Sequence, residues 1–533
     1  MSRTPLFRFL RRSLRLAQCS LRSGMAPGEV VDGSRERAVL NRRELLTAAA
    51  SAAAVTAYAG CAPARLLTRR PPDAGVLVFG AGIAGLTAAY RLEQRGVRVR
   101  LFEAANRIGG RMFSLRDHFA DGQVAELGGE LIDTGHGAIR GLAGELGIPL
   151  DDFAGEDAAV DRDVWFVDGR RIPEREVVEA FRPLAARIAA DLATLRGDGD
   201  VTFRSPNGGD RFDFTPLARY LDEAGVTGWL RKLLDVAYTA EYGLETDRQS
   251  SLNLLLLIAP EPDPFRIFGE SDERFHVRGG NDRIPRALAD RLEGSIETGA
   301  ALEAIRSAAD GRLVCTYRRA GASREVTAEH VLLAIPFTML RTVDIAVDLP
   351  AVKRRAIREL GYGTNAKLMV GFSERVWRTR HRSNGSVVTD LPFQSSWETS
   401  RLQPGQSGIL TNFAGGNHGL ELGKGTAAEQ AARFVADLER IFPGAAEHRR
   451  GMTEARFHWP SYPFTRGSYS CYLPGQWTAL RGVEGERVGN LHFAGEHCSL
   501  EAPGFMEGGC ETGEAAAREI LADLNLAPAA AAA

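Results

Sequence analysis

Residues 76–103 read VLVFGAGIAGLTAAYRLEQRGVRVRLFE, and this stretch decides the fold. The apolar run 76–79 predicts a short buried strand. A helical pattern follows and stops at Gly96, and apolar residues then alternate with arginines over 97–101, which predicts a second strand. The order strand, helix, strand predicts a βαβ unit and therefore a parallel α/β sheet.

Three glycines connect the first strand to the helix. Gly80, Gly82 and Gly85 follow the pattern G-x-G-x-x-G. The first permits a tight turn, the second lets the backbone approach a pyrophosphate, and the third lets helix and strand pack closely. The helix N-terminus, with Ala84 in its first turn, stabilises the pyrophosphate charge. Glu103 ends the second strand 18 residues after Gly85 and can accept hydrogen bonds from a ribose diol, so the unit predicts a dinucleotide site.

The segment after Glu103 distinguishes between dinucleotides. Residues 104–111 read AANRIGGR, a second glycine turn that carries an arginine. A nicotinamide cofactor does not need this turn, whereas a flavin held across a closed groove needs a further turn around its pyrophosphate and ribityl chain. Arg111 can donate paired hydrogen bonds to phosphate, although a surface ion pair is the alternative. We therefore predict FAD, in contact with Ala104, Arg107, Gly110 and Arg111.

The bulk composition is that of an ordinary globular protein. The 533 residues are 44% hydrophobic and 25% charged, enough for two domains with large cores. The formal net charge of −2 gives no electrostatic case for nucleic-acid binding. Six cysteines are too few for a disulfide scaffold, and none has the paired spacing of a zinc site, so we expect no metal. The sequence leaves the oligomeric state open.

Residues 1–73 precede the fold and carry the pattern of an export signal. Arg42 and Arg43 stand ahead of an Ala-rich apolar run to Gly60, which is too short to span a bilayer comfortably as a mature helix. Twin arginines before a modest apolar run resemble a signal for the Tat export machinery. An ordinary Ala-rich helix is the alternative. We expect a periplasmic or other extracytoplasmic location.

Two features of the N-terminal segment stay open, and the C-terminal end is of low complexity. Residues 58–61 resemble a lipoprotein cleavage box that ends at Cys61, with Tyr58 where Leu is usual, but Ala62-Pro63-Ala64 offers a competing ordinary cleavage site. The Arg-rich lead also allows translation to begin at Met25. Residues 526–533 are an Ala/Pro tail that we expect to be disordered.

Motifs later in the chain extend the pattern. Residues 126–130 read ELGGE, residues 493–499 read FAGEHCS and residues 503–509 read PGFMEGG. With the N-terminal glycine motif, these blocks resemble the flavin amine oxidase family of monoamine, polyamine and L-amino-acid oxidases, the GEH form being closer to polyamine oxidases. The resemblance covers roughly residues 74–523. It implies further FAD contacts at Gly128, Gly129, Glu130, Leu302, Gly495, Glu496, Gly504, Phe505 and Met506, with Leu302 at the adenine.

The resemblance implies an α/β fold with two discontinuous domains. A Rossmann-type FAD-binding domain would comprise residues 74–150, 265–340 and 455–525, and a second, α+β substrate-binding domain residues 151–264 and 341–454. The residue patterns agree in part. An apolar run predicts a strand that Pro336 stops, residues 278–281 read as a turn opening a helix, residues 508–520 read as a helix, and the stretch after Pro183 is helical.

Two segments are expected to carry the chemistry. Lys367 precedes an apolar run and is expected on a strand at the domain interface. The resemblance implies that it holds a water near flavin N5, whereas a snorkelling edge lysine is the alternative. Tyr469 and Phe505 match the two walls of the family's aromatic cage, the alternative being two ordinary core aromatics. Ser468 stands where monoamine oxidases place the cysteine bonded to FAD, so we predict non-covalent FAD; Cys471 would point to the other face of a strand.

The substrate class depends on residues 126–136. Leu131 stands where venom-type L-amino-acid oxidases carry the arginine that holds the substrate carboxylate. Asp133 stands where polyamine oxidases carry an acid, and it would favour a second, distal ammonium group. A solvated turn residue is the alternative for Asp133. Glu130 and His136 are further candidates close to Asp133 in the sequence. Arginines elsewhere in the chain, such as Arg278 or Arg116, could also bind a substrate carboxylate.

The resemblance implies an amine oxidase. Hydride would pass from the amine-bearing carbon to flavin N5, the imine would hydrolyse to a carbonyl, and O₂ would reoxidise the flavin to give H₂O₂. An L-amino-acid oxidase is the first alternative, and a flavin desaturase or demethylase is more distant. A non-catalytic flavin-binding partner protein would leave Lys367, Tyr469 and Phe505 without a purpose.

Overall fold

The computed structural model describes residues 75–526 apart from 157–159, 162, 198–199, 259–265, 270, 295 and 450. These residues belong to one compact unit. The predicted export signal, the candidate lipidation at Cys61 and all but the first residue of the predicted C-terminal tail lie outside the described residues.

The predicted βαβ unit is present. It consists of β1 (Val76–Phe79), α3 (Ile83–Glu93) and β2 (Val99–Glu103), and β2 pairs parallel to β1. The helix ends three residues before Gly96, whose φ of 72° lets the chain turn back toward the sheet.

β1 lies at the centre of a five-stranded parallel sheet with the order β20-β13-β1-β2-β9. All four residues of β1 are buried, as expected for a strand with both sheet faces covered. Its distant partners are β9 (Ile296–Thr298), β13 (His330–Leu333) and β20 (Leu491–Phe493). The strand predicted before Pro336 is β13.

Two further sheets and two short ladders complete the strands. The four-stranded sheet contains β10 (Ala300–Ser307), β11 (Leu313–Arg319), β12 (Ala322–Ala328) and β14 (Asp344–Ala346). The seven-stranded sheet contains β6 (Val164–Val167), β7 (Arg170–Ile172), β15 (Ala366–Phe372), β16 (Val387–Thr389), β17 (Ser395–Glu398), β18 (Gly408–Ala414) and β19 (Glu454–His458). The ladders pair β3 (Ser114–Leu115) with β4 (Ala125–Glu126), and β5 (Leu150–Asp152) with β8 (Phe275–Val277).

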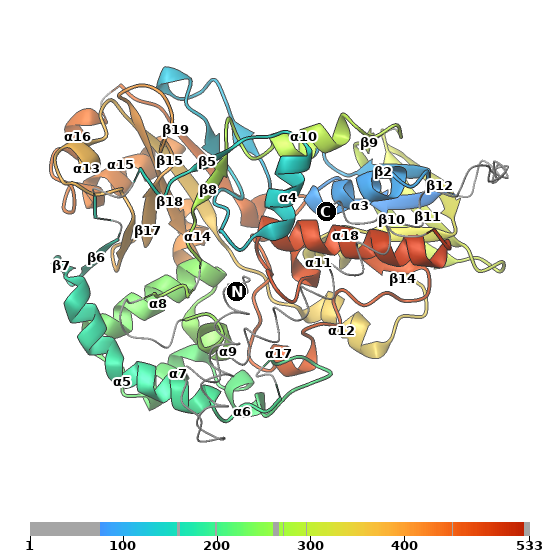
Figure 1. Ribbon diagram of the computed structural model, residues 1–533, viewed down its shortest axis with the longest axis horizontal. Coiled ribbons are helices and arrows are strands. Elements are labelled where there is room, and N and C mark those ends of the chain that lie inside the picture. Colours follow the sequence, from blue (N-terminus) through green and yellow to red (C-terminus); the bar gives the residue numbers. More distant parts are fainter. Residues whose placement is uncertain are drawn as a thin grey trace, which may run out of the picture. The chain divides into compact units, whose positions relative to one another are not determined.

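The C-terminal helix α18 (Met506–Asp523) lies beside α3 (Figure 1). A Cβ atom at Gly513 would lie 2.4 Å from the carbonyl oxygen of Ala84, and one at Gly509 would lie 2.6 Å from the side chain of Ile83. Glycine at these two positions therefore allows the close approach of the helices, whose N-termini both line the cavity described below.

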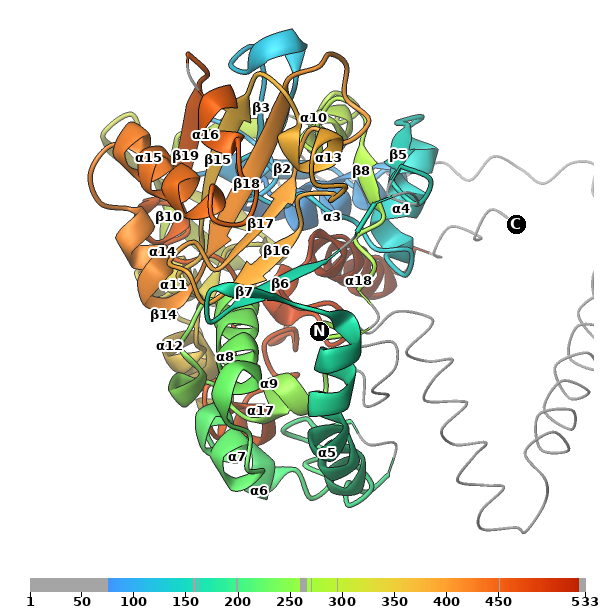
Figure 2. The same cartoon turned by 90° about the vertical axis from the view of Figure 1, so that its left-hand side faces the viewer.

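The remaining helices surround the sheets. They are α4 (Gly137–Glu145), α5 (Glu174–Leu192), α6 (Asp210–Asp213), α7 (Leu217–Glu223), α8 (Gly228–Tyr242), α9 (Leu252–Leu255), α10 (Arg283–Ala289), α11 (Phe337–Leu340), α12 (Ala351–Glu359), α13 (Val376–Thr379), α14 (Gly416–Leu422), α15 (Ala427–Leu438), α16 (Ala445–His448) and α17 (Gln476–Ala479). Figure 2 shows α5 to α9 gathered below the seven-stranded sheet. No helix within the described ranges is long and apolar enough to cross a bilayer.

Helix α5 differs from the sequence-based expectation. It begins at Glu174, so Pro183 lies inside it rather than before it. Val177 and Phe181 are fully buried on the same face as Ile188. Burial of this continuous apolar face outweighs the backbone hydrogen bond that proline cannot donate.

The predicted α/β class is confirmed. We keep the division into an FAD-binding and a substrate-binding domain, with its residue boundaries, as a proposal. Because β19 pairs with β15, a boundary drawn by sheet membership would fall after His458 rather than at residue 455.

Candidate active site

A cavity of about 440 Å³ is lined by loops of the parallel sheet and by side chains of the seven-stranded sheet. Its volume is in the range of cofactor and small-molecule sites, roughly 300–1,000 Å³. Of the predicted site residues, all except Gly85 and Asp133 line it. The structure thus brings together segments that are more than 400 residues apart in the sequence.

The two glycine turns face each other at one end of this cavity. Gly80 has a φ of 108°, and a Cβ atom there would lie 2.3 Å from the carbonyl oxygen of Ala334. A Cβ atom on Gly110 would lie 3.1 Å from the Cα of Gly82. A Cβ atom at Gly85 would lie 1.9 Å from the carbonyl oxygen of Gly80, so Gly85 serves packing. Bare backbone therefore faces the cavity, as a pyrophosphate requires.

Helix α3 presents free backbone donors at the same place. No side chain caps its N-terminus at Gly82, and Ile83 and Ala84 line the cavity. The first amides of a helix have no partner within the helix, and they attract anions.

Glu103 lies beside these turns. Its two carboxylate oxygens each accept one backbone hydrogen bond, from Ala81 and from Ala105, both at 2.8 Å. Burial raises the pKa of this carboxyl, and the two backbone donors oppose the rise. A carboxylate accepts about four hydrogen bonds, so capacity remains for a ribose diol. The amide of Gly299 donates to the carbonyl of Ala105 at 2.9 Å, which brings the start of β10, and with it Leu302, to this end.

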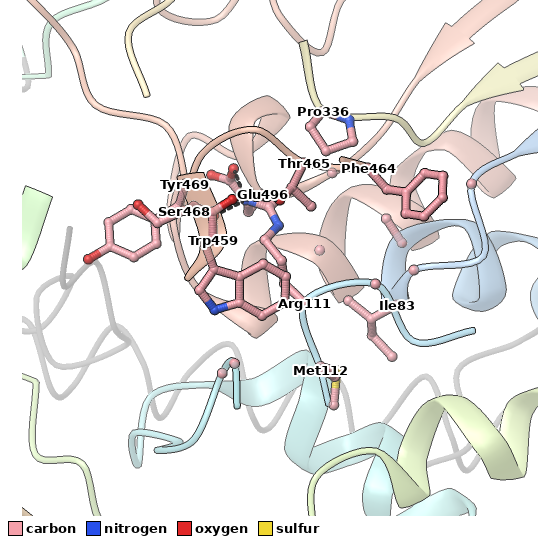
Figure 3. A pocket seen from close by; sticks show the side chains of 18 of the residues that line it. Ile83, Arg111, Met112, Pro336, Trp459, Phe464, Thr465, Ser468, Tyr469 and Glu496 are labelled. Atoms are coloured by element: carbon pink, nitrogen blue, oxygen red, sulfur yellow. Dashed lines mark hydrogen bonds and ion pairs between the residues drawn. The ribbon is translucent and has the colours of Figure 1, made fainter. Parts of the chain in front are cut away.

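Both predicted arginines line the cavity but are held by protein acceptors. Arg111 donates to the carbonyl of Ser468 at 2.6 Å and to Glu496 at 2.9 Å, and Figure 3 shows its side chain reaching toward both, with Trp459 alongside. It is therefore an ion pair within the cavity rather than at the surface. Arg107 donates to the carbonyls of Ile108 and Gly110 and so shapes the second glycine turn.

The C-terminal motif closes the cavity. Gly495 has a φ of 139°, and the Glu496 carboxylate accepts hydrogen bonds from Ser470 and from the amide of Gly504. Burial raises the pKa of Glu496, but the Arg111 charge and several donors lower it below its usual range. Met506 packs against Gly129, where a Cβ atom would lie 2.7 Å from its side chain. The glycines, the free helix amides and Glu103 together fit an FAD molecule.

Lys367 lies on β15, as predicted, and its side chain is almost fully buried. Its ammonium donates to the Glu130 carboxylate at 2.7 Å, to the carbonyl of Gly128 at 2.8 Å and to that of Glu126 at 3.3 Å. Burial raises the pKa of Glu130, but the Lys367 charge lowers it below its usual range. All three ammonium donors are therefore occupied, and a water would replace the longest of these bonds.

Tyr469 and Phe505 flank Gly504. The Tyr469 hydroxyl donates to the carbonyl of Glu241, and its ring lies 3.5 Å from where a Cβ atom on Gly504 would be. Phe505 packs against the His136 ring, with centroids 5.0 Å apart.

The segment around Tyr469 is irregular chain rather than a strand. It has a single bridge, from Ser470 to Tyr362. Cys471 is a buried free thiol that does not line the cavity, and Cys498 and Cys510 are also free rather than bonded to each other.

Asp133 does not occupy the place predicted for it. It is 1% exposed and does not line the cavity. Its carboxylate accepts hydrogen bonds from the Ser271 hydroxyl at 3.0 Å and the Glu273 amide at 2.8 Å. His136 accepts the Asp133 amide at Nδ1, so its Nε2, 3.3 Å from the carboxylate, carries the proton of the neutral ring. Burial raises the pKa of Asp133 to about 6.

Two acids that the sequence analysis missed line the cavity instead. Glu241, near the end of α8, and Glu273, next to β8, are both among its lining residues. Within the described part of the chain, no hydrogen bond reaches the Glu241 carboxylate, and burial raises its pKa. Glu241 follows Leu234, Ala237 and Tyr238 at helical spacing. An acid in line with the apolar face of a predicted helix was therefore the sequence feature that could have identified it.

Within the described ranges, no free cation lines the cavity beside these acids. Arg401, whose charge lowers the pKa of Glu273, lies outside the lining and donates to the carbonyl of Glu398 at 3.1 Å. The cationic side chains that line the cavity are Arg107, Arg111 and Lys367, and each is bound to protein acceptors. Arg116 pairs with Asp282, and Arg278 pairs with Asp151, both outside the cavity lining. Leu131, which stands where venom-type L-amino-acid oxidases carry a carboxylate-binding arginine, lines the cavity.

Comparison with known proteins gives a family match. The sequence model described as "Flavin containing amine oxidoreductase" matches residues 83–521. A Bacillus subtilis (strain 168) protein provisionally named L-amino-acid oxidase YobN is 25% identical, over 84% of this chain and 94% of its own length. Flavin-containing amine oxidase B of Sus scrofa is 25% identical, over 85% and 87%. An L-amino-acid oxidase of Siganus canaliculatus is 26% identical, over 80% and 81%.

Solved structures share the fold. Cyclohexylamine oxidase from Brevibacterium oxydans superposes with a TM-score of 0.74 at 21% identity, covering 85% of this chain and all of the other. Wild-type putrescine oxidase bound to putrescine superposes with a TM-score of 0.71 at 20% identity, covering 84% of this chain and 99% of the other.

Proposed function

The chain belongs to the family of flavin-containing amine oxidoreductases, and from this premise we propose that its substrate is an amine without a neighbouring carboxylate. Its cofactor is FAD, which when bound accepts a hydride from the amine-bearing carbon and passes the electrons to O₂, so that H₂O₂ and an imine form and the imine hydrolyses.

The charge of the substrate end of the cavity carries the proposal. Glu241 and Glu273 line it, and the described cations around it are all bound to protein acceptors. A substrate carboxylate would face two acids and no free cation, which is unfavourable in a partly desolvated site. Burial raises the pKa of both carboxyls, that of Glu273 to about 8, and a neighbouring ammonium group would lower it again. A second ammonium group would therefore draw these carboxyls into the ionised form and pair with them. Diamines are therefore the preferred class, and the two glutamates take the role that the sequence analysis gave to Asp133.

Aromatic side chains prepare the reacting amine. Tyr469 and Phe505 line the cavity with Trp397 and Phe413. Apolar walls exclude water and favour the neutral amine, the form that can lose a hydride. Lys367 supplies a fixed positive charge on the same wall, held in place by Glu130.

We also propose that FAD is held without a covalent bond. Ser468 occupies the flavin-edge segment, its hydroxyl donates to the side chain of Asn365 at 2.6 Å, and no described cysteine lines the cavity. Acid precipitation of the purified protein should leave all yellow colour in the supernatant. Flavin that stays with the pellet would contradict this.

The substrate class is tested by a peroxide-coupled assay on matched pairs: tyramine with tyrosine, putrescine with ornithine, and phenethylamine with phenylalanine. We expect turnover of the amines, with the diamine best. Turnover of only the amino acids would favour the second candidate, an L-amino-acid oxidase, which the two relatives of that name support. That result would not affect the conclusion that the cofactor is FAD.

Export is proposed on the sequence alone. Arg42 and Arg43 precede an apolar run as in Tat signals, a route that suits proteins folded around a cofactor. The paired change Arg42→Lys and Arg43→Lys should retain the protein in the cytoplasm. Unchanged fractionation of that variant would refute the proposal.

A further inference from the structure

Two histidines and an aspartate meet far from the cofactor cavity. His330 is the first residue of β13, His492 lies on the neighbouring strand β20, and Asp523 is the last residue of α18. His492 pairs with Leu332 in the sheet, so His330, two residues before Leu332, lies on the same sheet face. Leu332 packs in one core with Ile520 of α18, which places the helix over that face.

The three ligand atoms form a compact triangle with one short side. His330 Nδ1 is 3.3 Å from His492 Nε2, and the Asp523 Oδ2 atom is 3.9 Å and 4.0 Å from these two nitrogens. A point equidistant from three atoms at these separations lies about 2.2 Å from each. Zinc–nitrogen and zinc–oxygen bonds measure about 2.0–2.2 Å. A Zn²⁺ ion would therefore fit with shifts of a few tenths of an ångström.

The surroundings suit a metal-bound imidazole. His492 Nδ1 lies 3.1 Å from the Glu519 carboxylate. With Nδ1 donating to Glu519, the neutral ring of His492 turns the lone pair of Nε2 toward His330 and Asp523. A carboxylate that orients a ligating histidine in this way is a recurrent feature of metal sites.

The cluster is buried on the sheet side and open on the helix side. The histidine side chains are 6% and 0% exposed, whereas Asp523 is 28% and Glu519 is 43% exposed. An ion can therefore enter past the carboxylates, and a water can complete its coordination. Arg487 also pairs with Asp523, so an ion would compete with this guanidinium for one oxygen.

We propose that His330, His492 and Asp523 bind one divalent transition-metal ion of the zinc type. Two imidazole nitrogens and one carboxylate oxygen are a ligand set typical of Zn²⁺. Mg²⁺ prefers oxygen ligands, so it should bind this site more weakly. The ion ties the C-terminal end of α18 to two strands of the parallel sheet. This ion would be independent of the proposed substrate, and its presence would contradict the sequence-based expectation of no metal.

The test uses the full-length FAD-loaded protein, stripped with a chelator and dialysed against buffered ZnSO₄. The variants are His330→Gln, His492→Gln and Asp523→Asn, and the control is His418→Gln, at an exposed histidine of α14. We expect one more bound zinc per chain in the wild type and the control than in each variant. Zinc, but not MgSO₄, should raise the thermal unfolding temperature of the wild type and of the His418→Gln control by a few degrees, and it should leave that of the other three variants unchanged.

Equal zinc content and equal thermal shifts in all five proteins would overturn the proposal, because any zinc would then be bound elsewhere. No bound zinc in the wild type would overturn it as well, and the histidines would form only a hydrogen bond. Asp523→Asn keeps the test decisive if a buried histidine variant fails to fold, since Asp523 is partly exposed at a helix end.

Discussion

Lys367→Met should destabilise the protein, because it leaves the Glu130 carboxylate without its partner, and it should also slow flavin reduction. The ammonium and the carboxylate are 2.7 Å apart, and their side chains are 5% and 4% exposed. Removing one partner of a buried ion pair leaves the other charge uncompensated, which costs about 3–5 kcal/mol. Adding Glu130→Gln removes that charge and keeps an acceptor for the Thr399 hydroxyl, which donates to Glu130 at 2.8 Å. The double variant should therefore recover most of the lost stability.

The pH dependence gives a second signature of the same pair. In Lys367→Met, burial acts on Glu130 without the opposing lysine charge, so the pKa of Glu130 rises above its unfolded value. A raised carboxyl pKa lowers stability above the unfolded pKa, so the deficit of the single variant should shrink as the pH falls toward 4.

Urea unfolding with FAD in fixed excess measures stability, and stopped-flow reduction by substrate measures the chemistry. We expect flavin reduction to stay slow in both variants, because both lack the cation near the flavin. A single variant within 1 kcal/mol of wild type would refute the pair's energetic role. A double variant that reduces flavin at the wild-type rate would refute the chemical role of Lys367.

Three further predictions follow from the site. Asp133→Asn removes a carboxyl whose folded pKa is about 6 against a usual 3.8, so the unfolding free energy of wild type should fall relative to this variant by about 2 kcal/mol between pH 4 and pH 6; a constant difference would contradict the shift. Glu241→Gln should raise KM for putrescine about tenfold or more and leave a monoamine of similar length nearly unchanged, with exposed Glu179→Gln as the control; equal effects on both amines would count against a distal ammonium site. Gly85→Ala places a Cβ atom 1.9 Å from a backbone oxygen, so FAD retention through gel filtration should drop sharply, and full retention would show that the turn can relax.

The cofactor half of the site was predictable because its signals are local. Gly80, Gly82 and Gly85 stand next to a strand and open a helix, and each glycine has a conformational reason that the sequence context already implies. The second glycine turn follows within a few residues. Residues that are close in the sequence are also close in space here, so the glycine pattern alone predicts the cofactor-binding turns.

The substrate half was predictable only in part. Resemblance placed Lys367, Tyr469 and Phe505 in the cavity lining, but it placed Asp133 there too. Asp133 lies close in sequence to Glu130, which does line the cavity, yet the chain turns and buries it against backbone and hydroxyl donors. Proximity in sequence therefore did not give proximity to the substrate.

The parallel sheet also explains why the histidine cluster escaped detection and why it is not catalytic. His330 and His492 are 162 residues apart, so no spacing motif could join them; only the parallel pairing of β13 with β20 does so. In such sheets ligands bind outside the carboxyl ends of the strands. Ala334 and Gly495, just past the carboxyl ends of β13 and β20, line the cavity, whereas His330 begins β13 at the opposite end, about 10 Å away along the strand. A metal there can stabilise the far end of α18, whose N-terminus meets the cofactor, without touching the reacting atoms. Zinc should thus raise the unfolding temperature of the wild type but not of Asp523→Asn, while the two proteins turn over at the same rate with saturating FAD, with or without zinc.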